Sequence, residues 1–277
     1  MNIDPMANEL LTAFEASLAL TGRRPSNGGL YAGVDLGTAY IVTAVVDAMG
    51  VPLAGAITRS ESSIRDGLVL DYMGAIRLLR EQVHKLRAAG FPIKKAAGAF
   101  PPGTEGRNAQ AVANVLYAAD LEVTGLIDEP SAAAKVLRIT DGAVIDIGGG
   151  TTGISVIRDG EPIYTADEAT GGTHVDLVLA GHYKVDVLEA EKIKTDPTRQ
   201  REILPLVTPV FQKMASIVKQ HLKGQFVDTL YLVGGTSCFP GIECVMEQET
   251  DIPVAKPANP LLVTPLGIAL ACAETAQ

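Results

Sequence analysis

The stretch VIDIGGGTTGISVI, residues 144–157, decides the fold of this chain. An apolar run containing Asp146 leads into a turn of glycines and threonines, and apolar residues then alternate at period two. This pattern predicts two antiparallel strands joined by a tight turn. After a turn at Asp159-Gly160, a third strand is expected over 162–166.

The same pattern occurs once more, earlier in the chain. The stretch GVDLGTAYIVTAVVD, residues 33–47, again has an aspartate, one apolar residue and a glycine before an alternating segment. A turn at Gly50 and an apolar run to Ile57 complete a second three-stranded meander. Two copies of one supersecondary unit predict two similar domains that face each other.

Helices and strands alternate after each copy. After the first copy we expect helices at 72–89, 105–119 and 131–139, and strands at 95–100 and 122–128. After the second we expect helices at 173–182, 203–223, 241–250 and 264–275, a helical insert before the second of these, and strands at 229–233 and 252–256. Strands separated by helices pair in parallel through right-handed crossovers. The fold class is therefore α/β, with three antiparallel strands extended by two parallel ones in each half.

The glycine turns favour phosphate binding over dinucleotide binding. Gly148, Gly150 and Gly153 fit GxGxxG, but a strand follows them where a dinucleotide fold needs a helix, and the P-loop pattern GxxxxGK[ST] is absent. Backbone N–H groups of a glycine turn can bind phosphate oxygens, and carboxylates such as Asp35 and Asp146 can hold Mg²⁺ through water. The alternative is two tight turns with a purely structural role.

Composition limits the possible partners. The chain has 277 residues, 47% of them hydrophobic, and a formal net charge of −9. The acidic balance argues against nucleic acid or an anionic membrane as partner. The three cysteines have no CxxC spacing, which argues against a disulfide framework and against a zinc site. No apolar run reaches the roughly 18 residues of a membrane span. We expect a cytoplasmic protein.

Five ordered segments resemble the signature motifs of the actin/DnaK/sugar-kinase superfamily of ATPases. They are the phosphate loops 33–38 and 146–152, the connectors 128–134 and 265–269, and the adenosine loop 232–241. The resemblance implies two ribonuclease-H-like domains around a cleft that binds ATP or ADP with Mg²⁺. The expected limits are 30–139 for the first domain, joined by the C-terminal helix at about 264–277, and 140–263 for the second.

The resemblance also implies roles for individual residues. The magnesium ligands, acting through water, would be Asp35 and Asp146. Phosphate contacts would come from Gly37, Thr38, Gly148, Gly149, Gly150, Thr151 and Thr152, with Gly171 and Gly172 in a turn nearby. Thr151 would also contact the γ-phosphate or the attacking water, and Gly234 and Gly235 would let adenosine lie against bare backbone.

Three further residues have two interpretations each. Glu129, before Pro130, would orient or deprotonate the attacking water; alternatively it is a helix-start residue favoured by the helix dipole. Glu191 and Lys194 lie three apart on one helix face and would contact the ribose and base; alternatively they form a solvated ion pair.

A closer resemblance covers three other segments. Residues 66–72, 100–104 and 166–172 are similar to the EutJ family, chaperone-like proteins encoded with bacterial ethanolamine-utilisation microcompartment genes. This implies an ATP-binding, weakly ATP-hydrolysing protein that assists a client enzyme or shell component of a microcompartment. DnaK-type chaperones carry a catalytic lysine after the third strand, where this chain has Arg65 and Asp66, so hydrolysis is expected to be slow or absent.

Other functions remain open within the same fold. A polymerising bacterial actin would need subunit-contact loops, for which the insert 60–71 offers little. A nucleotide-dependent switch without hydrolysis would need no catalytic lysine. A small-metabolite kinase would ordinarily need more chain for its substrate pocket.

The N-terminal residues predict a helix followed by a linker, 1–29. The stretch 8–20 is apolar-rich but interrupted by Glu9 and Glu15, and TGRRPSNGG, residues 21–29, is typical of a linker. The helix either packs on the body or is a docking helix on a tether. On the second interpretation, deletion of residues 1–27 leaves folding and nucleotide binding intact.

Overall fold

The computed structural model describes residues 3–20, 29–60, 72–102 and 106–276. The linker 21–28, the insert 61–71 with Arg65 and Asp66, and residues 103–105 lie outside the described residues. Sequence expectations that fall on these segments therefore stay predictions.

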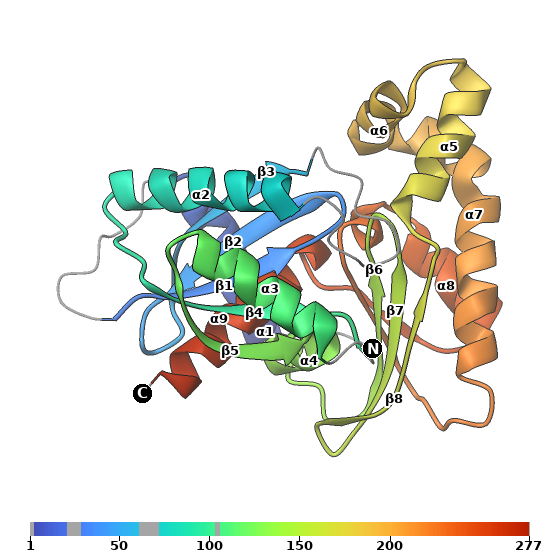
Figure 1. Ribbon diagram of the computed structural model, residues 1–277. Coiled ribbons are helices and arrows are strands. Elements are labelled where there is room, and N and C mark those ends of the chain that lie inside the picture. The colour runs from blue at the N-terminus through green and yellow to red at the C-terminus, as the bar shows by residue number, and fades with distance from the viewer. Residues whose placement is uncertain (1–2, 21–28, 61–71, 103–105, 277) are drawn as a thin grey trace.

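The first sheet has the strand order β3-β2-β1-β4-β5. Its strands are β1 (Tyr31–Leu36), β2 (Tyr40–Val46), β3 (Pro52–Arg59), β4 (Lys95–Phe100) and β5 (Glu122–Asp128). The first three are antiparallel, and β4 and β5 run parallel to β1. One face carries α2 (Tyr72–Ala88) and α3 (Arg107–Ala118), whose buried aliphatic residues share a core with this sheet (Figure 1).

The second sheet repeats this plan with the order β10-β9-β6-β7-β8. Its strands are β6 (Gly142–Ile147), β7 (Thr152–Arg158), β8 (Glu161–Glu168), β9 (Leu230–Val233) and β10 (Val254–Ala255). Its helices are α5 (Gly172–Tyr183), α6 (Val187–Thr195), α7 (Gln200–His221) and α8 (Ile242–Thr250). The predicted arrangement of three antiparallel strands extended by two parallel ones is confirmed in both sheets.

One predicted strand is shorter than expected. The segment 252–256 forms only the two-residue β10 at the edge of its sheet. Pro253 and Pro257 flank it and have no backbone N–H to donate, which confines regular pairing to the residues between them.

A shared core lies between the two sheets and is built around α4 (Glu129–Leu137) and α9 (Val263–Thr275). Small residues let these helices approach closely, because a Cβ atom on Gly267 would overlap the carbonyl oxygen of Ala132. Gly33 of β1 allows the same close approach to Ala269 of α9. The two predicted connector segments therefore cross where the halves of the molecule join.

The N-terminal helix α1 (Pro5–Ser17) belongs to this shared core. The side chains of Leu11 and Phe14 are fully buried, and a Cβ atom on Gly55 of β3 would lie 2.6 Å from the Phe14 ring. Of the two interpretations of this helix, packing on the body is correct. The expectation that residues 1–27 can be removed without effect on folding is wrong, because removal would expose this apolar face of the core.

Candidate functional site

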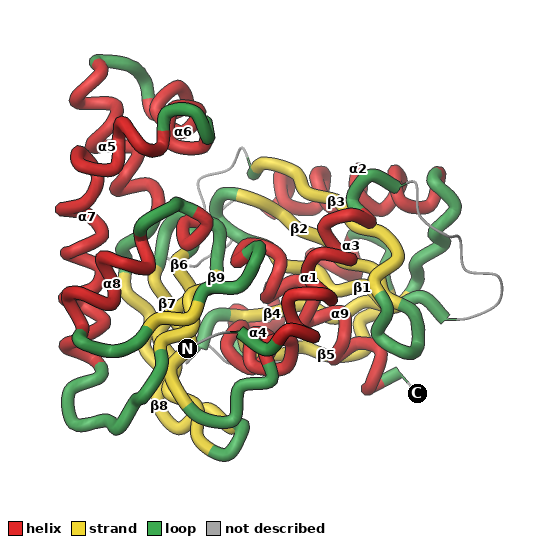
Figure 2. The backbone as a smooth tube through the Cα atoms, turned by 180° about the vertical axis from the view of Figure 1, so that it is seen from behind, coloured by secondary structure: helices red, strands yellow, loops and turns green. Residues whose placement is uncertain are grey.

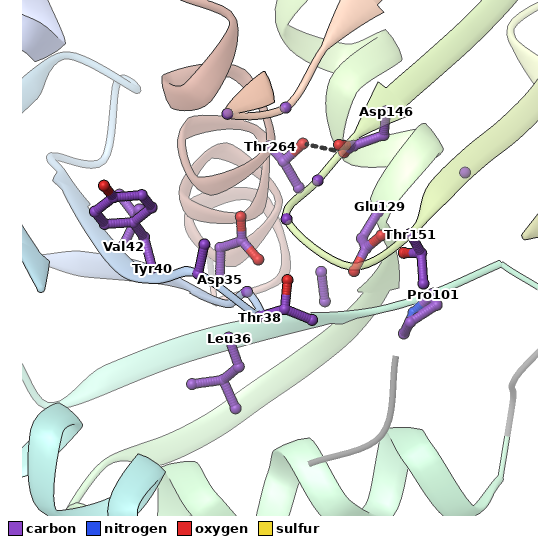
Figure 3. Close-up of a pocket in the computed structure, with 18 of the residues that line it drawn as sticks. Asp35, Leu36, Thr38, Tyr40, Val42, Pro101, Glu129, Asp146, Thr151 and Thr264 are labelled. Carbon is purple, nitrogen blue, oxygen red and sulfur yellow. Dashed lines mark hydrogen bonds between the residues drawn. The ribbon is translucent and has the colours of Figure 1, made fainter. Parts of the chain in front are cut away.

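A cavity of about 330 Å³ lies between the two sheets, at the ends of β1 and β6 (Figure 3). Ten of the predicted site residues line it. They are Asp35, Gly37, Thr38, Glu129, Asp146, Gly148, Gly149, Thr151, Gly234 and Gly235. The cavity thus brings together residues from both glycine turns, the first connector and the adenosine loop.

Strand register explains why the two aspartates face the same space. Asp35 is the second-last residue of β1 and pairs with Val42, and Asp146 is the second-last residue of β6 and pairs with Gly153. The two hairpin turns therefore start at equivalent places. Figure 3 shows the carboxylates of Asp35, Asp146 and Glu129 around one cavity, with Glu129 at the start of α4.

The two hairpin turns touch each other directly. The Gly150 N–H donates a hydrogen bond of 3.0 Å to the Thr38 hydroxyl, and a Cβ atom on Gly149 would lie 2.8 Å from the same oxygen. Only a glycine at 149 permits this approach. This hydrogen bond also shows that the Gly150 N–H points into the space between the two turns, where a phosphate oxygen would lie.

Gly171 and Gly172 support the second turn without lining the cavity. The Gly172 and Thr173 N–H groups donate to the carbonyls of Gly148 and Gly149, at 3.0 and 2.8 Å. A Cβ atom on Gly171 would lie 2.8 Å from both carbonyl oxygens. The start of α5 therefore fixes the conformation of the turn from behind.

The carboxylates of the cavity are poor acids. Burial, and secondly the charge of Asp146, raise the pKa of Asp35 to about 7. Burial also raises the pKa of Asp146 to about 6, against the opposing hydrogen bond of 3.2 Å from the Thr264 hydroxyl. The pKa of Glu129 lies well above its usual value, because of burial first and then the charges of Asp146 and Asp35. Such clusters of perturbed acids are concentrated at functional sites.

Glu129 has both of the positions proposed for it. It is the first residue of α4, whose N-cap Asp128 accepts a hydrogen bond of 2.9 Å from the Ser131 N–H. Its side chain lines the cavity at the same time. The two interpretations are therefore compatible, because the strand-to-helix junction itself places the carboxylate in the cleft.

Glu191 and Lys194 are not among the residues that line the cavity. Glu191 forms an ion pair with Arg59 of β3 and accepts a hydrogen bond of 3.4 Å from the Tyr40 hydroxyl. Lys194 donates to Asp176 of α5 at 2.9 Å. Glu191 and Lys194 therefore pair with other residues and not with each other. Their contacts with a ribose and base stay a prediction.

Thr152 also differs from expectation. Its side chain is fully buried, and its hydroxyl donates to the Thr170 carbonyl at 2.7 Å. The hydroxyl therefore braces the end of the β7–β8 pair and does not face the cavity. The next residue, Gly153, lines the cavity, and successive residues of a strand face opposite sides of the sheet.

Two residues of the site were missed by sequence reasoning. Asp167 of β8 pairs with Gly153, which pairs with Asp146, so both aspartates belong to one row across the sheet. Burial raises the pKa of Asp167, and the Thr151 hydroxyl opposes this by lowering it. The alternation of β8 could have indicated Asp167, whereas Thr264, which binds Asp146 from α9, gave no local signal.

A direct metal centre is not apparent in the described part of the chain. Among those residues, no three His, Cys, Asp or Glu side chains come close enough together to hold a metal ion. The described helices also include none that is long and apolar enough to cross a membrane.

Comparison with known proteins gives the family. Residues 54–195 match the model of the MreB/Mbl protein family, and residues 128–265 match that of the type IV pilus assembly protein PilM. The ethanolamine utilization protein EutJ of Salmonella typhimurium is 41% identical, covering 94% of this chain and 92% of its own length.

Solved structures agree with this assignment. The crystal structure of EutJ from Carboxydothermus hydrogenoformans has a TM-score of 0.89 and 48% identity, covering 95% of this chain and 97% of that one. MreB5 of Spiroplasma citri, bound to ADP, has a TM-score of 0.67 at 18% identity, covering 86% and 94% of the two chains, a likeness of fold alone. The chain has the actin-like ATPase fold and belongs to the EutJ family of ethanolamine utilization proteins.

Proposed function

We propose that this protein binds ATP or ADP with Mg²⁺ in the cleft between its two sheets. The observation that carries the proposal is the pair of equivalent hairpin ends, Asp35 and Asp146, which line one cavity together with their glycine turns. Backbone N–H groups in such turns bind phosphate oxygens without interference from side chains. The ADP bound to MreB5, a protein of the same fold, is consistent with this site.

Asp35 and Asp146 would hold Mg²⁺ through its water molecules. No third acidic, histidine or cysteine ligand is close enough among the described residues for direct binding, and Mg²⁺ commonly keeps several waters and takes its remaining ligands from phosphate oxygens. The bound cation would offset the negative charge of the phosphates. It would also relieve the repulsion between the two carboxylates, which now raises the pKa of Asp35.

Glu129 and Thr151 are proposed to act on the attacking water. The raised pKa of Glu129 makes this carboxylate a stronger proton acceptor than an ordinary glutamate. Thr151 lines the cavity, and its hydroxyl can both donate and accept a hydrogen bond there, so it would contact the attacking water or the γ-phosphate.

Gly234 and Gly235 are proposed to receive the adenosine. Gly234 has φ +87°, and a Cβ atom there would overlap the Asp146 carboxylate, so the end of β9 needs a glycine. Glu191 and Lys194 would reach the ribose and base only by exchanging their present partners, Arg59 and Asp176.

The cleft is proposed to close around the nucleotide by rotation at α4 and α9. These helices cross between the two sheets at Gly267 and Ala132, and the absence of bulky side chains there allows small rotations. Closure would be the signal that a partner protein recognises. Identical small-angle scattering profiles with and without ATP would contradict this.

The biological role is proposed from the family. The EutJ relatives indicate ethanolamine utilisation, and we propose a chaperone-like role toward a client enzyme or shell component, in the cytoplasm or at a bacterial microcompartment. Pull-down of the intact protein with and without ATP would identify the client. The MreB likeness keeps a polymerising protein as second candidate, and ATP-dependent sedimentation of the purified protein would support that candidate instead.

Calorimetry tests the nucleotide site. The protein is expected to bind one ATP or ADP per chain, more tightly with Mg²⁺ than without. Gly149→Ala should weaken binding because its methyl group would push the two turns apart, whereas Gly181→Ala, whose methyl group meets nothing within 4 Å, is the matched control. Absence of binding heat for both nucleotides, with and without Mg²⁺, would refute the proposal.

A further inference from the structure

The helix α1 is attached to both halves of the molecule. Its apolar face, with Leu11 and Phe14, packs on β3 of the first sheet beside α9. Figure 2, the view from behind, shows α1 in front of the first sheet, on the face turned away from the viewer in Figure 1. This apolar contact fixes α1 to the first half of the molecule.

The polar edge of α1 binds a segment that follows the second sheet. The Asn8 side-chain oxygen accepts a hydrogen bond of 2.9 Å from the Ala258 N–H. The Asn259 side chain donates to the Glu15 carboxylate, also at 2.9 Å. These two contacts, seven residues apart on one side of the helix, hold the 258–259 segment against α1.

That segment continues directly into a wall of the cavity. The Pro260 carbonyl accepts a hydrogen bond of 3.1 Å from the Gly234 N–H, and Leu261 lines the cavity. A Cβ atom on Gly235 would lie 3.4 Å from the Leu261 side chain. Two residues of backbone therefore separate the Asn259 contact with α1 from the wall beside the adenosine loop.

We propose that α1 is a strap whose docking is coupled to nucleotide binding. The inference rests on the proposed nucleotide site. A nucleotide that lies against Gly234, Gly235 and Leu261 fixes the 258–262 segment, and the fixed segment presents both polar partners to α1. Coupling between binding events is reciprocal, so a looser α1 edge weakens nucleotide binding by the same factor by which nucleotide tightens α1.

The physical reason for the coupling is the different anchoring of the two sides of α1. The apolar side is fully buried and moves with β3, whereas the polar side holds its partners by two hydrogen bonds at exposed positions. A rotation of the sheets about α4 and α9 strains these hydrogen bonds before it disturbs the buried side. The strap therefore resists opening of the cleft at the side where adenosine would lie.

The double variant Asn8→Ala, Glu15→Ala tests the strap in the full chain. It removes both polar contacts and leaves the buried face intact; Glu9→Ala, an exposed change on the same helix, is the control. Calorimetry should show MgATP affinity about threefold or more weaker in the double variant and unchanged in the control. Hydrogen exchange of residues 8–17 should slow on addition of MgATP in the wild type, and less in the double variant.

Two results would overturn the inference, and they are distinguishable. If the wild type binds MgATP but the double variant binds it equally well and α1 exchange does not respond to MgATP, the strap is refuted and the nucleotide site stands. If the wild type binds no nucleotide, the proposed function fails and the strap fails with it. The exchange measurement on the wild type tests the coupling even if the double variant folds poorly.

Discussion

Replacement of Asp35 by asparagine should make the protein more stable at pH 8 while it damages the proposed magnesium site. Burial and the charge of Asp146 raise the pKa of Asp35 from 3.8 to about 7, so at pH 8 the folded protein carries a carboxylate charge that its surroundings disfavour. Asparagine has nearly the same shape and no charge. The variant therefore removes the unfavourable free energy of burying the Asp35 charge in the folded state.

The size of the gain follows from the shift in pKa. A change from 3.8 to about 7 corresponds to at most about 4 kcal/mol in the free energy of unfolding at pH 8. Because the cavity opens to solvent and the cluster can relax, we expect about 1–3 kcal/mol. The folded-state pKa is the higher one, so the cost builds up as the pH rises from about 4 to about 7 and is complete above about 7. The gain should be largest at pH 8 and shrink steadily toward pH 5.

Urea denaturation of the wild type and variant from pH 5 to 8 measures this difference. Asp159→Asn removes the same charge from an exposed turn and serves as the matched control. In a parallel thermal shift at pH 8, MgATP should raise the melting temperature of the wild type more than that of Asp35→Asn. A variant less stable than the wild type at pH 8, or a gain that does not shrink at lower pH, would refute the reasoning.

Three further predictions concern other parts of the molecule. Phe14→Ala should lower the free energy of unfolding by about 3–5 kcal/mol in urea, because the ring is fully buried; a loss below about 1 kcal/mol would mean that α1 is not part of the core. Glu129→Gln should change ATP affinity by less than about tenfold and lower turnover on the order of 10²-fold; equal turnover in steady-state assays would leave Glu129 only its role at the helix start. Gly267→Ala should destabilise by about 1–3 kcal/mol through overlap with Ala132, in contrast to Gly181→Ala, and calorimetric melting that shows no difference between the two would contradict close packing of α4 and α9.

The sequence by itself determined the elements and their order. The segments 95–100 and 122–128 are strands with the predicted bounds. Helix α2 ends one residue before its predicted end, and α9 begins one residue before its predicted start. These features are local: period-two alternation, helical periodicity and glycine turns encode backbone hydrogen bonds between near neighbours. Duplication of the meander then fixed the sheet order and the equivalence of Asp35 and Asp146, because each copy places its aspartate at the same strand end.

Only the tertiary structure decided the partners of polar side chains and the place of α1. Glu191 and Lys194 are neighbours on one helix, yet they pair with Arg59 and Asp176, which lie on different elements. The hydrogen bonds from Thr264 to Asp146 and from Asn259 to Glu15 join residues more than a hundred positions apart. Such contacts depend on how the two sheets dock about α4 and α9. A local pattern records the propensity of a segment, whereas the docking follows from the sum of all buried surfaces, so no single segment could have indicated it.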